Sequence, residues 1–310
     1  MRWGDMRRSE NVEDRGGMVG GGGGGFPLGG GGMRIGGGTL IVLVILALIF
    51  GINPLEFLGM AGPEVTAPAP APAPAPQSSP PSAPGQGTSA GRVGAPTDMR
   101  KDFAARVVGD TEDVWGALFK AMGNDRYPPT TLTLYRGAVR SGCGTASSAA
   151  GPFYCPADRH VYLDTAFFDE LARRFGAPGD FAQAYVIAHE VGHHVQNLTG
   201  VMQKFESQGQ RLDERRRNAL SIRLELQADC YAGVWGHFAQ KRNLLEPGDL
   251  EEGLRAAGAV GDDTIMKRTQ GYVVPDAMNH GSAEQRARWF RAGLQSGDPR
   301  TCDTFGAATP

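Results

Sequence analysis

The chain has 310 residues, of which 41% are hydrophobic and 21% charged, and its formal net charge is −2. This length is enough for a domain with a buried core, and so balanced a charge gives no electrostatic basis for a nucleic-acid partner. The 46 glycines and 21 prolines are too many for one compact fold, and more than half of them precede residue 98. The sequence therefore predicts a low-complexity N-terminal part followed by a globular part.

Residues 1–34 mix charged side chains with glycine runs and have no apolar period. Such a segment cannot bury enough surface to offset its conformational entropy, so we expect it to be disordered. Residues 61–96 are rich in proline, alanine, serine and glycine and begin with an alternating Ala-Pro tract. We expect an extended linker there, which holds a folded domain of residues 97–310 away from a membrane.

An apolar segment lies between these two stretches. Its uninterrupted part is Leu40–Ile52, and we expect a transmembrane helix over residues 35–60. A buried core helix or a signal-peptide core would be equally apolar, but the flanking sequence favours an anchor. Basic residues before the segment predict a cytoplasmic N-terminus and an exported domain. They are Arg2, Arg7, Arg8, Arg15 and Arg34, and the next after the segment is Arg92.

Four cysteines follow the apolar segment, on the side expected to be exported. An oxidising compartment favours two disulfides, which we expect to join Cys143 to Cys155 and Cys230 to Cys302. A Cys/His metal cluster is the alternative, but the close C-x-x-C spacing of structural zinc sites is missing.

The globular part is expected to be α+β, with a small sheet and a mainly helical remainder. Residues 97–123 are typical of two short helices, with Thr111 capping the second. "TTLTLYRGAV" and "RHVYLD" have the β-branched and aromatic bias of strands. "TAFFDELARRFG" is an amphipathic helix that ends at Gly176.

The motif "AHEVGHHVQ" lies in a predicted helix, which Asp180 would cap with Gln183 reaching back. His189 and His193 are four residues apart, so both imidazoles project from one face and can bind one zinc ion. Glu190 lies beside them, where it can accept a proton as a general base. His194 projects from another face and is interpreted as a packing or hydrogen-bonding residue.

A catalytic zinc site needs a third protein ligand. The best candidate lies in the predicted helix 218–238, where Glu225 and Asp229 are four residues apart beside an apolar stripe. Glu225 would bind the ion and Asp229 would hydrogen-bond a ligand imidazole. From spacing alone, a solvated acidic edge that pairs with Arg223 or Arg216 is equally compatible.

The HExxH motif is followed by S-x-R-x-E-x-x-A-D, whose glutamate, Glu225, lies 36 positions after His189. This arrangement resembles gluzincin metallopeptidases, in particular the CAAX prenyl protease and its stress-induced bacterial relatives. The whole layout resembles the bacterial family called "putative neutral zinc metallopeptidase", including "MRW", "GCG…PFYCP", "ELQADCYAGVW" and "HGSAEQRARWF". The resemblance implies a zincin-like fold, Glu225 as a zinc ligand and peptidase activity. Because this chain has only one predicted membrane span, unlike the prenyl protease, the resemblance does not imply a lipidated substrate inside the membrane.

His280 precedes a predicted helix that Ser282 would cap with Gln285. The prenyl protease group has a similar H-P-S-x-x-x-R segment, in which proline stands where this chain has Gly281. The resemblance makes His280 a candidate catalytic residue facing substrate or oxyanion, beside the plain reading of a helix start. We expect His160 to point to solvent and His237 to lie too far from Glu225 to share an ion.

These patterns together predict a membrane-anchored zinc endopeptidase that cleaves peptides or proteins in the cell envelope. The resemblance implies that substrate binds as an added strand beside an edge strand of the sheet, which we expect to be residues 159–164. The alternatives are a tethered zinc-containing binding module without proteolytic activity and a zinc hydrolase of other envelope amides. Glu190 argues against the binding module, because a structural zinc site needs no base.

Overall fold

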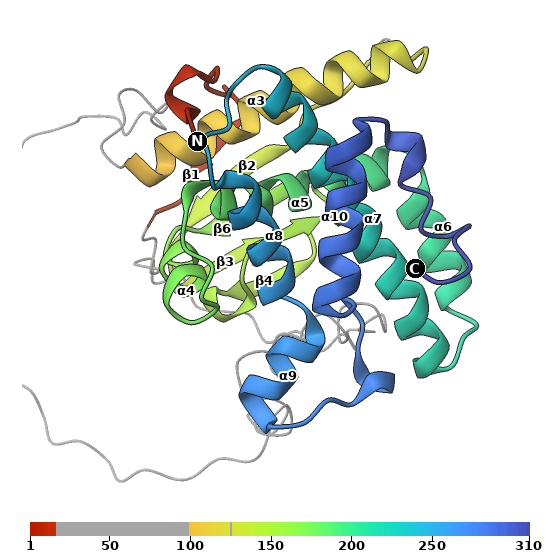
Figure 1. Cartoon of the computed structure of the whole chain (residues 1–310). Coiled ribbons are helices and arrows are strands. Elements are labelled where there is room, and N and C mark those ends of the chain that lie inside the picture. The colour runs from red at the N-terminus through yellow and green to blue at the C-terminus, as the bar shows by residue number, and fades with distance from the viewer. Residues whose placement is uncertain (17–98, 125) are drawn as a thin grey trace, which may run out of the picture.

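The computed structural model describes residues 1–16, 99–124 and 126–310 (Figure 1). The predicted anchor at 35–60 and the predicted linker at 61–96 lie outside the described residues. Within the described ranges, no helix is both long enough and apolar enough to span a membrane.

The described part is mixed α and β and mostly helical, as expected. Its first elements are η1 (Trp3–Asp5), β1 (Val12–Asp14), α3 (Met99–Ala121), β2 (Thr131–Tyr135), β3 (Ala138–Ser141), β4 (Gly144–Ser147), η2 (Ser148–Ala150), β5 (Phe153–Cys155) and β6 (His160–Asp164). The rest are α4 (Phe167–Arg173), α5 (Asp180–Leu198), α6 (Val201–Gly209), α7 (Glu214–Lys241), α8 (Asp249–Ala259), α9 (Asp262–Gln270), η3 (Pro275–Ala277), α10 (Ala283–Ser296) and η4 (Pro299–Thr301).

The main sheet has the strand order β1-β2-β6-β5, and β3 and β4 form a separate hairpin. β1, β2 and β6 are parallel, whereas β5 is antiparallel to β6. The expectation that residues 159–164 form an edge strand is therefore wrong. β6 is almost wholly buried, as expected of a strand inside a sheet. β5 and β1 are the two edge strands of this sheet, and Pro152 and Pro156 on either side of β5 limit its length.

Residues 1–16 are ordered, so the expectation of disorder is wrong for this part of the N-terminal segment. β1 pairs with β2, and the Trp3 ring packs edge-on against Phe103 of α3. The backbone of Arg7 lies very close to α3. A Cβ atom on Gly109 of that helix would be only 2.3 Å from the Arg7 carbonyl oxygen. The segment folds because it supplies apolar contacts at Trp3, Met6 and Val12.

The first helix of the globular part is also longer than expected. α3 runs without interruption through Thr111, which is buried and donates its hydroxyl hydrogen to the Val108 carbonyl oxygen. The side chain of Asp110 accepts hydrogen bonds from Trp235 of α7 and from Arg242, the C-cap residue of that helix. These tertiary contacts outweigh the local tendency of the Gly-Asp-Thr sequence to end a helix.

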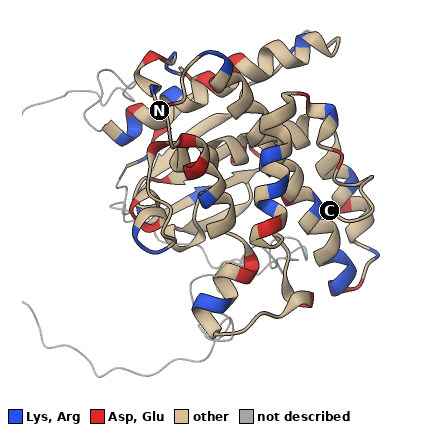
Figure 2. Ribbon diagram, viewed as in Figure 1, with Lys and Arg blue, Asp and Glu red and all other residues tan. Residues whose placement is uncertain are grey.

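The helices α5, α7, α8 and α10 pack together, and their buried side chains form a large part of the hydrophobic core (Figure 1). α7 and α10 cross closely at two glycines: a Cβ atom on Gly233 would lie 2.0 Å from the Phe290 carbonyl oxygen, and one on Gly293 would lie 1.9 Å from that of Cys230. Figure 2 shows basic and acidic residues side by side on α10.

Both expected disulfides are present. Cys143–Cys155 joins the β3–β4 turn to β5, and Cys230–Cys302 joins α7 to the C-terminal segment. The first disulfide therefore restrains the edge strand, and the second restrains the helix that carries Glu225.

Candidate metal centre

α5 positions the HExxH motif inside the protein. Residues of this helix are buried from Phe181 to Gln196, except Gln183. Its N-cap is Gly179, and no side chain caps it, so the expected capping by Asp180 does not occur. The Asp180 carboxylate instead accepts hydrogen bonds from the Met1 amino group at 2.8 Å.

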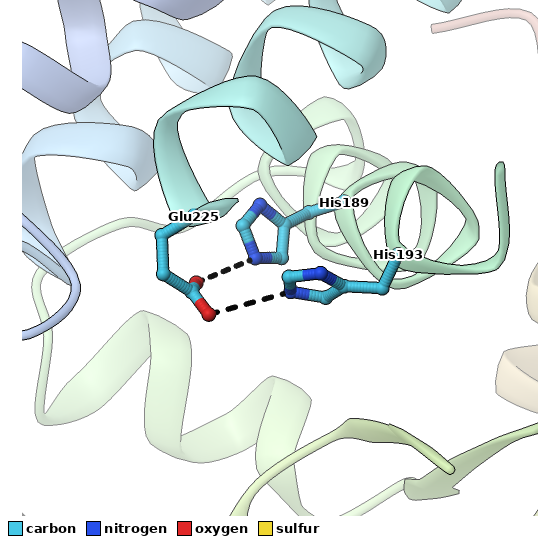
Figure 3. Close-up of side chains that lie close together, drawn as sticks. All are labelled: His189, His193 and Glu225. Atoms are coloured by element: carbon cyan, nitrogen blue, oxygen red, sulfur yellow. Dashed lines mark ion pairs between the residues drawn. The ribbon is translucent and has the colours of Figure 1, made fainter. Parts of the chain in front are cut away.

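The structure brings His189, His193 and Glu225 together, with the two histidines on α5 and the glutamate on α7 (Figure 3). Glu225 oxygens lie 3.2 Å from Nε2 of His189 and 3.5 Å from Nε2 of His193. In a tetrahedral zinc site with bonds of about 2.0–2.1 Å, ligand atoms are separated by about 3.3 Å. The three side chains are therefore close enough together to bind one zinc ion.

Hydrogen bonds at the other ring nitrogen orient both imidazoles. Nδ1 of His189 lies 2.9 Å from the Asp229 carboxylate, and Nδ1 of His193 lies 2.8 Å from the Gln196 side-chain oxygen. In each ring this contact assigns the proton to Nδ1 and leaves Nε2 as the metal-binding atom. Asp229 thus occupies the supporting position expected from its spacing to Glu225.

Asp229 is completely buried, and its charge is balanced by Arg286 of α10. The guanidinium donates to both Asp229 oxygens at 2.9 Å, and the Tyr185 hydroxyl donates to one of them at 2.5 Å. Arg286 was not recognised from the sequence. The zinc site was taken there as the only positive partner of the buried Asp229. The available signal was the arginine at the end of the "HGSAEQR" motif.

The charges at the site are strongly coupled. Burial opposes ionisation of Glu225, but the neighbouring His193 and His189 outweigh it and hold the Glu225 pKa well below its usual value. Burial also acts against the protonated form of His189, but Asp229 outweighs it and raises the His189 pKa to about 9. Without a metal, the ionised Glu225 carboxylate thus faces a protonated His189 imidazole. A divalent cation would take the place of that proton.

Glu190 is buried beside the ligands, and burial raises the pKa of its carboxyl group. The nearby His193 and His189 act in the opposite direction, as does a hydrogen bond from the backbone of Tyr154 in β5. Glu190 therefore lies between the metal ligands and the edge strand, and its environment shifts its pKa toward the range useful for proton transfer.

His280 is held in place by Asp262, the first residue of α9. Its Nδ1 lies 3.0 Å from one Asp262 oxygen, and the other oxygen accepts backbone hydrogen bonds from Asn279, His280 and Gly281. The charge of His280 is close enough to lower the pKa of Glu225. Ser282 and Gln285 cap the N-terminus of α10, as predicted. The loop before this helix therefore brings the His280 imidazole toward the ligand cluster.

The remaining histidines have structural partners. His194 is buried between the Tyr154 hydroxyl and the Pro128 carbonyl oxygen, and burial lowers its pKa to about 4. His237 contacts the Leu294 carbonyl oxygen. His160 is only partly exposed and bonds to Thr133, so the expectation that it points to solvent is wrong. The parallel neighbour β2 covers it, which strand alternation within β6 did not reveal.

Two histidines on one helix and a carboxylate on a second define the type of mononuclear metal site that zinc peptidases use. A family model described as "Putative neutral zinc metallopeptidase" matches residues 1–305, and the chain belongs to this family. The match begins at residue 1 and therefore includes the ordered N-terminal segment.

Among similar chains, "Uncharacterized protein YpfJ" of Escherichia coli (strain K12) is 44% identical over 306 residues, which cover 99% of both chains. "Uncharacterized protein Rv2575" of Mycobacterium tuberculosis is 44% identical over 239 residues, which cover 73% of this chain and 78% of the relative. No solved structure matches the chain.

Proposed function

We propose that this protein is a zinc-dependent endopeptidase that hydrolyses peptide bonds in the bacterial cell envelope. The observation that supports it most is the convergence of His189, His193 and Glu225, with the buried Glu190 beside them. A site that only stabilises the fold needs no acid next to its ligands.

His189, His193 and Glu225 would hold the zinc ion, which in such sites supplies the Lewis acidity that activates water and polarises a carbonyl group. Glu190 takes the proton of the attacking water and passes it to the leaving amine. Its raised pKa suits both steps, because the group must first accept the proton and then release it. His280, oriented by Asp262, donates a hydrogen bond to the carbonyl oxygen as negative charge develops there.

Substrate would bind as an extended strand on the outer edge of β5, with which no described strand pairs. This strand is the sheet edge beside the HExxH helix, because the Tyr154 backbone contacts Glu190 and its hydroxyl contacts His194. Backbone pairing along β5 would fix the peptide at the site without selecting its sequence.

The proposed location rests on two features. Two disulfides favour an oxidising compartment, and the apolar segment of residues 35–60 would attach the chain to the cell membrane. The substrates would then be peptides or proteins of the envelope.

The test is hydrolysis of a diverse peptide mixture by the zinc-loaded full chain, with new termini identified by mass spectrometry. Cleavage should stop when a chelator removes zinc, and it should be about 10²- to 10⁴-fold slower in Glu190→Gln carrying the same zinc. Zinc-loaded protein that binds peptides and cleaves none of them would favour the binding module instead.

A further inference from the structure

A cavity of about 300 Å³ lies at the end of the proposed substrate edge, outside the metal site. It is lined by Pro156, Ala157, Asn197, Met202, Gln203 and Glu206. Pro156 and Ala157 directly follow β5, and the other four residues belong to α5 and the start of α6. The cavity is therefore bounded by the same strand and helix that frame the catalytic groups.

Local contacts fix the position of this cavity relative to the metal ligands. Asn197 is one helical turn beyond His193 on α5, a rise of about 6 Å. Its side-chain amide donates to the Tyr154 hydroxyl at 2.8 Å and to the Pro156 carbonyl oxygen at 3.4 Å. An extended peptide advances about 3.3 Å per residue. A peptide on β5 would thus place a side chain over the cavity about two residues from the bond at the metal.

α6 forms the opposite wall. Gly200 has a φ of 80°, and this left-handed residue lets the chain turn from α5 directly into α6. The Gln203 amide donates to the Asn197 side-chain oxygen at 2.8 Å, which holds the first turn of α6 against the end of α5. Met202 and Glu206, four residues apart on α6, consequently face the cavity together.

The lining suits a long side chain with a cationic end. Pro156, Ala157 and Met202 offer apolar surface for an aliphatic stem, as lysine and arginine side chains require. The Glu206 carboxylate is exposed, and it has no ion-pair partner among the residues that the structure describes. It is free to receive an ammonium or guanidinium group.

We propose that this cavity is a specificity subsite that selects a lysine or arginine side chain about two residues from the scissile bond, with Glu206 as its charge partner. The position of the subsite relative to the scissile bond rests on the proposed peptidase function. The cavity's preference for a basic side chain can be measured without cleavage.

The test uses the full chain carrying Glu190→Gln and zinc, so that peptides bind without being consumed. Blocked, fluorescein-labelled decapeptides contain a single lysine that is moved through an otherwise uncharged sequence, and binding is read as anisotropy. One lysine position should bind about threefold to tenfold tighter than its norleucine counterpart. Adding Glu206→Gln should abolish this difference, and Glu206→Lys should shift the preference to glutamate.

Glu251→Gln is the matched control, because Glu251 is an exposed glutamate of α8 that does not line the cavity. Equal binding of lysine and norleucine peptides, or a preference that survives Glu206→Gln, would overturn the subsite. The same peptides are then given to the wild type. Cleavage without a basic preference would refute the subsite alone, whereas lysine-selective binding without any cleavage would refute the peptidase function alone.

Discussion

At the residue scale, the metal centre depends on hydrogen bonds behind the ligands. Asp229 orients His189, and Arg286 neutralises Asp229 within the protein interior. A lone buried carboxylate would be costly, so Arg286 keeps Asp229 ionised whether or not zinc is bound. The ligand set is thereby prepared before the metal arrives.

We predict that Arg286→Lys lowers zinc affinity about 10-fold to 100-fold, because lysine keeps the charge but cannot contact both Asp229 oxygens. Competition with a chromogenic chelator measures this affinity. Arg291→Lys, an exposed change on the same helix, should leave it unaltered. Equal zinc affinity in Arg286→Lys and wild type would show that the Asp229–Arg286 contact does not support the metal.

Zinc binding should also release a proton from His189. The imidazole holds a proton below its pKa of about 9 in the metal-free protein, and this proton must leave before Nε2 can bind the ion. Between pH 6.5 and 8.5, the logarithm of the zinc association constant should therefore rise by about one per pH unit from this group. Calorimetry in buffers of different ionisation enthalpy counts the protons released. A pH-independent affinity would contradict the assignment.

At the element scale, the crossing of α7 and α10 brings Glu225, Asp229 and Arg286 to the face of α5. The closeness of this crossing depends on Gly233 and Gly293, where no Cβ atom fits. The contact between Arg286 and Asp229 is therefore sensitive to the distance between the two helices.

Gly233→Ala is expected to destabilise the fold by at least about 1–3 kcal/mol and to weaken zinc binding, because the new methyl group would push α10 away from α7. Denaturant unfolding of the chelated protein and chelator competition measure the two effects. Gly116→Ala provides the control, since nothing lies within 4 Å of a Cβ atom there and alanine favours a helix. Unchanged unfolding in Gly233→Ala would contradict the close crossing.

Much of this arrangement could be predicted from local patterns. The spacing in "AHEVGHHVQ" places His189 and His193 on one helix face. The same spacing of four residues places Glu225 and Asp229 together on another helix. Spacing alone did not distinguish a ligand pair from a solvated edge at Glu225. That distinction depends on how α7 crosses α5, which is a tertiary property.

The errors share a physical cause. Edge position in the sheet depends on strand order, so β6 was mistaken for the edge strand that β5 provides. Thr111 and the N-terminal residues were interpreted from local preference, whereas contacts with distant segments decide their structure. Arg286 was missed because its partner lies on another helix, 57 positions away in sequence.

At the scale of the whole molecule, residues 1–16, 99–124 and 126–310 form one folded unit, in which β1 of the N-terminal segment belongs to the main sheet. A single membrane crossing between them, as the sequence predicts for residues 35–60, would place them in different compartments. The folded unit requires both on the same side.

We therefore predict equal access to Glu10→Cys and Glu284→Cys in intact cells, probed with a membrane-impermeant maleimide. Both positions are exposed, and the four native cysteines are paired in disulfides, so background labelling is low. Labelling of Glu284→Cys alone would show that the N-terminal segment is separated from the domain in the cell. Its pairing with β2 would then be absent from the membrane-bound protein.

The central claim is that Glu190 activates water at a zinc site to hydrolyse peptides. The most direct measurement is the incorporation of oxygen-18 into new C-termini when the full zinc-loaded chain acts on a peptide mixture in labelled water. The account predicts labelled new termini with wild type and a rate lower by about 10²- to 10⁴-fold in Glu190→Gln of equal zinc content. Equal rates in the two proteins, or no new termini with wild type, would contradict it.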